Sequence, residues 1–134
     1  MRKAEGSGEI ANGLTQVLHR AALARGCIAV ATCGACGRRQ AIPGDSCFAC
    51  GSRTLEVHDH PGNGRVFSWV VNHFAFRPEL AAELPYCVLL VSLDGGGRVY
   101  GRLVPSEGPI EADRPVVLDP KLTQERGYPV FRWS

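Results

Sequence analysis

Four cysteines place the strongest constraint on how this chain can fold: Cys33, Cys36, Cys47 and Cys50. They form two C-x2-C pairs, each followed by a glycine, and ten residues separate the pairs. Two such turns that face each other bring four thiolates to one point, which is the ligand set of a closed tetrahedral metal site. We therefore expect these cysteines to bind a structural metal ion.

The residues around the cysteines are consistent with this site. Gly37 and Gly51, which follow the pairs, can adopt the positive φ that directs backbone N–H groups toward a sulfur. Pro43-Gly44-Asp45 predicts the turn that makes the two halves face each other. Zn²⁺ is the expected ion and iron is the alternative, because four-sulfur tetrahedral sites suit both. Disulfides or a redox pair are disfavoured, because no thioredoxin-like βαβ pattern surrounds the cysteines.

The length of the chain, 134 residues, suits one domain or two small modules. A metal-stabilised ribbon is itself a small module, so the second description is the better one. We expect an N-terminal helix in residues 1–26, a zinc ribbon in residues 27–60 and a second module in residues 61–134.

The remaining cysteines, Cys27 and Cys87, lie in apolar runs and are expected to be buried free thiols. The N-terminal sequence MRKAEGSGEI lacks the apolar segment of a signal peptide. No apolar run approaches the roughly 18 residues that a membrane span requires. These features predict a cytoplasmic protein that makes no use of a membrane.

The charge distribution argues against nucleic acid as the partner. The formal net charge is only +2, and residues 58–134 hold eight basic and nine acidic residues. Zinc ribbons and small barrels can both bind nucleic acids, but such binding requires a basic surface. Single-stranded nucleic-acid binding is therefore a less favoured function for this sequence.

The segment Glu9–Arg25 has apolar residues at helical spacing, with Ser7 as the expected N-cap and Gly26 as the residue that ends the helix. In so small a chain, the apolar stripe of this helix packs either on its own core or on a partner.

Short strands are expected in the rest of the chain. In the ribbon they are Cys27–Thr32 and Arg53–Val57, and residues 58–64 are expected to be a linker. The second module contains a short helical signal at Pro78–Leu84 and five strands: Arg65–His73, Tyr86–Leu93, Arg98–Val104, Val116–Leu118 and Val130–Trp133. Antiparallel strands of this length, with Gly101 marking a bulge or a close bend, predict a closed barrel of the OB type. The fold class is therefore mainly β.

Alternation in the first of these strands predicts which side chains share a face. Phe67, Trp69 and Val71 are expected on one face, with Val66 and Val70 on the other.

The order of these motifs resembles the DUF35 family over residues 9–133. The resemblance rests on the helix and cysteine ribbon, followed by Gly62–Trp69, Pro85–Gly96 and Gly101–Val104. It implies a helix, a rubredoxin-like zinc ribbon and an OB-fold barrel. It also implies a non-catalytic partner of a thiolase-superfamily enzyme that acts on acyl-CoA: a thiolase, an acyltransferase or a lipid-transfer-protein-like aldolase of steroid side-chain degradation. Such a subunit would stabilise the enzyme in a hetero-oligomer and help shape its CoA-substrate passage. The resemblance also favours packing of the helix on that partner.

A stand-alone acyl-CoA-binding module is the alternative function. Arginines would meet the phosphates and phenylalanines would stack on adenine. The candidate ligand-binding residues are Arg38, Arg39, Phe74, Phe76 and Arg77.

An independent enzyme is disfavoured, because Cys87 lies in an apolar strand without a neighbouring base in the sequence. His58 and His60 could suggest a second metal site, but no third ligand is near them in the sequence.

Overall fold

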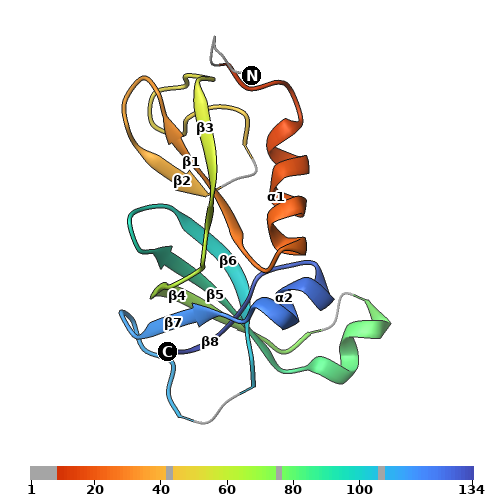
Figure 1. Cartoon of the computed structure of the whole chain (residues 1–134). Helices are drawn as coiled ribbons and strands as arrows, with labels where there is room; N and C mark the ends of the chain where they lie inside the picture. The colour runs from red at the N-terminus through yellow and green to blue at the C-terminus, as the bar shows by residue number, and fades with distance from the viewer. Residues whose placement is uncertain (1–8, 42–43, 75–76, 106–107) are drawn as a thin grey trace.

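The structure, a computed structural model, describes residues 9–41, 44–74, 77–105 and 108–134. A helix, a three-stranded sheet and a closed five-stranded barrel follow one another along the chain (Figure 1). The helices and strands are α1 (Leu14–Ala24), β1 (Ile28–Cys33), β2 (Arg39–Ala41), β3 (Leu55–His60), β4 (Gly64–Asn72), the 3-10 helix η1 (Pro78–Glu83), β5 (Tyr86–Leu93), β6 (Arg98–Leu103), β7 (Pro115–Leu118), α2 (Pro120–Arg126) and β8 (Val130–Trp133). The chain is mainly β, which confirms the predicted fold class.

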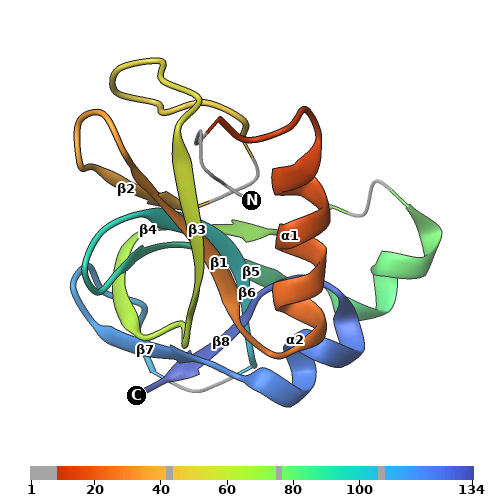
Figure 2. The same cartoon turned by 45° about the horizontal axis from the view of Figure 1, so that its top comes forward.

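The central strand of the three-stranded sheet, β1, is covered on both faces: the barrel packs on one face and α1 on the other. Successive side chains of a strand point to opposite faces. Ile28 and Val30 pack into the core of the barrel, whereas Ala29 and Ala31 pack toward α1. The small alanines allow the helix to lie close to the strand, and Figures 1 and 2 show α1 alongside β1 with one end near α2.

The barrel has the strand order β4-β5-β6-β8-β7, with β7 pairing back to β4. Its pairs are antiparallel except that β6 and β8 are parallel, so the expectation of a wholly antiparallel barrel is wrong there. Five strands in a closed barrel cannot alternate in direction at every pair, so one pair has to be parallel. Gly101 marks a close approach rather than a bulge, because a Cβ there would lie 2.5 Å from the ring of Phe131.

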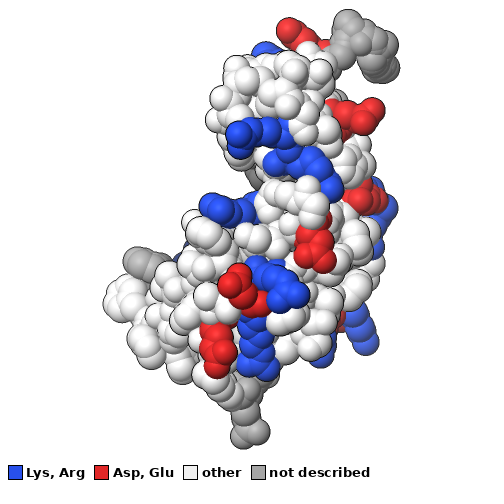
Figure 3. Space-filling model, turned by 90° about the vertical axis from the view of Figure 1, so that its left-hand side faces the viewer, with Lys and Arg blue, Asp and Glu red and all other residues white. Residues whose placement is uncertain are grey.

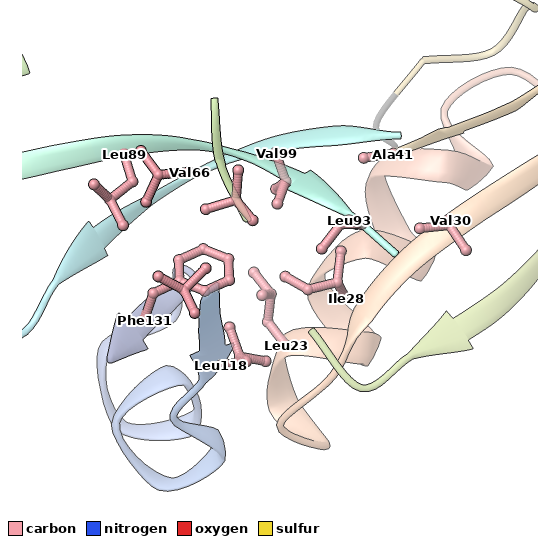
Figure 4. Packing of buried hydrophobic residues seen from close by; sticks show 12 residues of the cluster. Leu23, Ile28, Val30, Ala41, Val66, Leu89, Leu93, Val99, Leu118 and Phe131 are labelled. Carbon is pink, nitrogen blue, oxygen red and sulfur yellow. The ribbon is translucent and has the colours of Figure 1, made fainter. Parts of the chain in front are cut away.

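One apolar core runs from the barrel into the ribbon and the helix. Figure 4 shows Phe131, Leu89 and Val66 of the barrel in the same cluster as Leu23 of α1 and Ile28 of β1. Burial of these side chains against one another couples the stability of the three parts.

The helix begins at Leu14 rather than at the predicted Glu9. Glu9 instead forms an antiparallel bridge with Thr54, and the buried Ile10 joins the apolar cluster of the ribbon. Gly13 then turns the chain into the helix at a φ of 78°. The apolar residues at helical spacing therefore belong to two different elements: Ile10 lies in the segment that pairs with the ribbon, and the others lie in α1.

The other end of α1 agrees with the prediction, since Gly26 has a φ of 76°. The expected N-cap, Ser7, lies outside the described residues. The helix buries Ala22 and Leu23 within its own chain and leaves Val17 59% exposed. Its main apolar face is thus occupied by its own core, contrary to the expectation that it packs on a partner.

The predicted linker is shorter than residues 58–64. His58 and His60 belong to β3 and pair with Val30 and Ile28 of β1. The strand continues because β1 offers it an unpaired edge, a long-range partner that local composition does not reveal.

The predicted alternation in β4 fails at Val66 and at Phe67, which does not share a face with Trp69. A β-bulge between Val66 and Ser68 inserts Phe67, so that Val66 pairs with the buried Val91. Paired residues share a face. The bulge therefore places Val66 on the inner face with Trp69, whose partner Leu89 is buried.

The helix α2 was not predicted, although the sequence has the signals for it. Asp119 is its N-cap, Pro120 is its first residue, and Gly127 ends it at a φ of 78°. The Asp119 carboxylate accepts a hydrogen bond of 2.9 Å from the Leu122 N–H and another from the guanidinium of Arg132 in β8. These two donors, the N–H first, lower the pKa of Asp119.

Asp119→Ala is expected to cost about 1–2 kcal/mol of unfolding free energy at neutral pH, because it removes the cap and leaves donors unpaired. A lowered pKa stabilises the fold above the unfolded pKa, and this contribution is lost as the pH falls toward the folded value. The difference between variant and wild type should therefore shrink below about pH 4. Urea denaturation of both proteins at each pH measures it, and a constant difference would contradict the assignment.

Among the described residues, no helix is long and apolar enough to cross a membrane.

Candidate functional site

The four predicted cysteines come together at one end of the ribbon. Their Sγ atoms all lie within 4.8 Å of one another. The Sγ–Sγ distance is 3.6 Å both between Cys33 and Cys50 and between Cys36 and Cys47. A tetrahedral ion with metal–sulfur bonds of about 2.3 Å holds its sulfurs about 3.8 Å apart. The cluster therefore has the size and the donor set to bind a metal ion.

Two equivalent turns hold the cysteines. Gly37 and Gly51 have φ values of 79° and 80°, as predicted. Each donates its N–H over 2.9 Å to the carbonyl of the first cysteine of its pair, Cys33 or Cys47. The Cys33 and Cys47 sulfurs receive hydrogen bonds from N–H groups inside the turns, whereas the backbone donor to Cys50 is the N–H of Ser52, just after Gly51.

Hydrogen bonds from backbone N–H groups give the thiols of the cluster different pKa values. The N–H groups of Cys36 and Ala35 lower the pKa of Cys33 to about 6. The Ser52 N–H favours the thiolate of Cys50, but hydrogen bonds with the neighbouring cysteine thiols raise the pKa of Cys50 to about 11. Four thiolates so close repel one another, and a bound cation removes this repulsion by taking the place of the shared protons.

The cysteine cluster is continuous with the packing of the helix. Cys33 and Cys47 are buried and belong to an apolar cluster that contains residues of α1, β1 and β3. Its buried members are Ile10, Ala22, Ala29, Ala31, Cys33, Cys47 and Leu55. The position of α1 on the ribbon thus depends on the geometry at the cysteines.

Asp45, in the predicted turn between the cysteine pairs, ties this loop to the start of α1. Its carboxylate accepts hydrogen bonds from the Gly13 N–H at 3.0 Å and from the Thr15 hydroxyl at 2.7 Å. These donors lower the pKa of Asp45. Thr15 is buried and accepts from the Gly44 N–H at 3.0 Å.

A second surface feature is an apolar area on the outside of the barrel. We call it the outer apolar face; it consists of Phe67, Val70, Val88, Leu90 and Tyr100. Strand pairing joins Val70 to Val88 and Leu90 to Tyr100, so these residues lie on one face across β4, β5 and β6. Val70 is 66% exposed and Tyr100 is 68% exposed.

The sequence itself indicates this face through two apolar runs that do not alternate with polar residues. A strand of an antiparallel barrel with one solvated side should alternate apolar and polar residues. Val66–Val71 and Tyr86–Leu93 are instead apolar at nearly every position. Such runs indicate strands that present apolar side chains on both faces, one to the barrel core and the other to the surface.

The predicted ligand-binding residues fall into two groups. Arg39 is in β2, next to the β5–β6 hairpin, and donates to the Gly95 carbonyl at 3.2 Å. Phe74 and Arg77 follow the opposite end of β4, a strand of nine residues that spans about 27 Å. Phe76 lies outside the described residues. The structure therefore does not bring the two groups together.

The other candidate residues have structural partners. His60 Nε2 lies 2.7 Å from the Asp94 carbonyl, and its Nδ1 accepts from the Gly62 N–H. In the described part of the chain, the cysteine cluster is the group that could hold a metal ion. Cys27 and Cys87 are half-buried rather than fully buried, and burial raises the pKa of Cys87.

Comparison with known proteins places these features in a family. The model of the ChsH2 C-terminal OB-fold domain matches residues 57–119. A chain of the structure "Ltp2-ChsH2(DUF35) aldolase" is 32% identical, with a TM-score of 0.68 over 92% of this chain and 96% of that chain. The chain belongs to the DUF35 family. A DUF35 protein of unknown function from Sulfolobus solfataricus, with 15% identity and a TM-score of 0.60 over 91% of this chain and 87% of that chain, shares the fold.

A longer relative matches most of this chain. The probable enoyl-CoA hydratase alpha subunit of Thermomonospora curvata is 38% identical in an alignment of 111 residues that covers 78% of this chain. The matched region is 33% of that protein, so the chain spans about a third of its length.

Proposed function

We propose that this DUF35 chain is an accessory subunit of a thiolase-superfamily enzyme or an aldolase that acts on acyl-CoA substrates in the cytoplasm. The outer apolar face is the observation that carries this proposal. The similarity to a chain of the Ltp2-ChsH2(DUF35) aldolase, which extends over 96% of that chain, supports it. This similarity favours a lipid-transfer-protein-like aldolase as the partner over a thiolase or an acyltransferase.

The outer apolar face has the composition of the centre of a protein interface. Aromatic and branched aliphatic side chains that are freely exposed are unfavourable in water and favourable against a partner. Phe67 lies under the guanidinium of Arg98, which is 3.8 Å from the ring centroid, and this contact fixes the ring at the edge of the face. A larger enzyme subunit with a complementary apolar surface would cover Val70 and Tyr100.

The metal ion in this proposal is Zn²⁺ with a structural role. The four cysteine sulfurs would hold this ion and would leave no open position for a water nucleophile. The residues of this chain then supply no chemistry at the ion: the cysteines hold the two turns together and so position α1 on the ribbon. Catalysis belongs to the partner subunit, whose CoA-substrate passage the barrel would help to shape.

Val70→Asp is expected to release the chain from its partner, because the change buries an unpaired charge in the interface. Val70 is 66% exposed, so the variant should fold normally. The chain is co-expressed with the thiolase-like or aldolase protein encoded beside it, and the two are analysed by size-exclusion chromatography. Wild-type chains should elute together, and the variant should elute alone with its dissociation constant raised by about thirtyfold or more.

Val17→Asp on α1 is the matched control, since Val17 is similarly exposed but lies on the helix. It should leave the complex intact. Loss of the complex in this variant, with retention in Val70→Asp, would assign the interface to the helix instead. A wild-type chain that never co-elutes with the neighbouring enzyme would refute the accessory role.

A further inference from the structure

A cavity of about 740 Å³ opens at one end of the barrel, beside η1 and α2. The ends of β4 and β6, the start of β5, and β8 contribute to its wall together with these two short helices. In Figure 1, η1 and α2 lie at the end of the molecule away from the ribbon. A cavity of this volume can hold a small molecule, and the mouths of β-barrels are common positions for such sites.

The floor of this cavity is apolar. Cys87, Leu103 and Ile110 line it, and all three pack against the core of the barrel without being fully buried. Val71, at the end of β4, also lines the cavity and is 42% exposed. The cavity is therefore an open end of the barrel core. An apolar ligand in it would remove these side chains from water, which is favourable.

Three arginines lie at the cavity, and two of them already have carboxylate partners. Arg102 donates to Glu83 at 2.6 Å, and its guanidinium lies 3.6 Å from the centroid of the Tyr86 ring. Arg132 forms an ion pair with the Asp119 carboxylate. These two arginines hold η1 and the start of α2 in place as parts of the cavity wall, and their charges are neutralised.

Arg126, at the end of α2, is the third arginine and has no carboxylate partner among the described residues. Its Nη1 donates to the Tyr128 hydroxyl at 3.2 Å, which leaves other N–H groups of the guanidinium available. Glu125 precedes it on the helix, but consecutive helical residues do not face each other. One positive charge therefore remains unpaired at the edge of an apolar cavity.

The charged surface on another side of the molecule differs from this edge. Figure 3 shows basic and acidic side chains interspersed on the side that lies at the left in Figure 1. Charges of both signs at short range cancel much of each other's field. That side therefore offers an apolar anion neither a purely basic surface nor the apolar floor that the cavity has.

We infer that the cavity at the end of the barrel binds a small monocarboxylic acid with an apolar body, such as a medium-chain fatty acid. The apolar body lies against Cys87, Leu103 and Ile110, and the carboxylate accepts hydrogen bonds from Arg126. One unpaired charge matches one carboxylate, whereas the phosphates of a nucleotide or of CoA carry several charges. The site lies within one chain and does not depend on the partner subunit of the proposed function.

Isothermal titration calorimetry of the full, metal-loaded chain with octanoate, octanol and octanoyl-CoA tests the inference. Octanoate should bind about tenfold more tightly than octanol, which has the same chain without the charge, and more tightly than octanoyl-CoA. Arg126→Met should weaken octanoate about tenfold and leave octanol unchanged. Ala82→Phe, at an exposed position of η1 that lines the cavity, should fill the space and weaken both ligands.

Lys121→Met is the matched control for Arg126→Met, because Lys121 is an exposed basic residue of α2 that does not line the cavity. This variant should bind octanoate as the wild type does. Circular dichroism and metal content identify any variant that misfolds, and Arg126→Met and Ala82→Phe test the charge and the space separately.

The two half-buried cysteines outside the metal cluster locate the ligand. Octanoate should slow the alkylation of Cys87 by N-ethylmaleimide, followed peptide by peptide with mass spectrometry, and leave Cys27 unaffected, since Cys27 lies outside the cavity. Equal slowing of both cysteines, or no octanoate binding at millimolar concentration, would overturn the inference. So would octanol that binds as tightly as octanoate, or octanoyl-CoA that binds more tightly, which would assign the cavity to a thioester ligand.

Discussion

Cys36→Ser is expected to lose its metal ion and, with it, the packing of α1 on the ribbon. Metal binding contributes about 10–16 kcal/mol to the folding of small zinc modules, which is as large as the whole stability of a typical domain. The sulfur of Cys36 is one of four within 4.8 Å, and its removal opens the coordination sphere. Metal analysis per chain and thermal unfolding followed by circular dichroism measure the loss. Solubility or partner binding should fall together with the metal content.

Cys27→Ser is the control for this variant. Cys27 is a half-buried cysteine outside the cluster, and its change should leave metal content unaltered. A metal-free Cys36→Ser chain that melts and assembles as the wild type does would show that the ion has no structural role.

Phe131→Ala should cost about 3–5 kcal/mol of unfolding free energy, the usual range for removing a buried aromatic ring. Phe131 is fully buried at the centre of the barrel, and the ring packs directly on Gly101. No neighbouring side chain can fill the cavity from the Gly101 side, because glycine has none. Because the core also contains Leu23 and Ile28, the ribbon and helix should lose stability with the barrel.

Urea denaturation followed by two signals tests this expectation. Barrel unfolding and the release of bound metal should occur in one transition in the wild type and shift together in the variant. Phe67→Ala, on the outer apolar face, is the control and should cost much less, because its ring is already half-exposed. A loss below about 1 kcal/mol for Phe131→Ala would contradict the packing described for the core.

Features that depend on neighbours in the sequence were predictable from this chain. The cysteine spacing and the glycines that follow it define two turns whose geometry is local, and Gly37 and Gly51 have the expected positive φ. The strand Tyr86–Leu93 was found with its observed bounds, because its apolar run ends at a glycine-rich hairpin. The predicted ends of other elements agree less well with the structure. Glu9 pairs with Thr54 instead of starting a helix, a choice that depends on a residue far away in the sequence.

Local pattern was sufficient for the cysteine turns and for most of the strands, because each depends on spacing over a few residues. The tertiary structure decided which surfaces these elements share. It placed the inserted Phe67 beside Val70 and Tyr100 on the outside of the barrel, and it brought Arg98 to Arg38 across the boundary between ribbon and barrel. Register, bulges and the packing of one module on another follow from contacts between distant residues, which spacing alone does not encode.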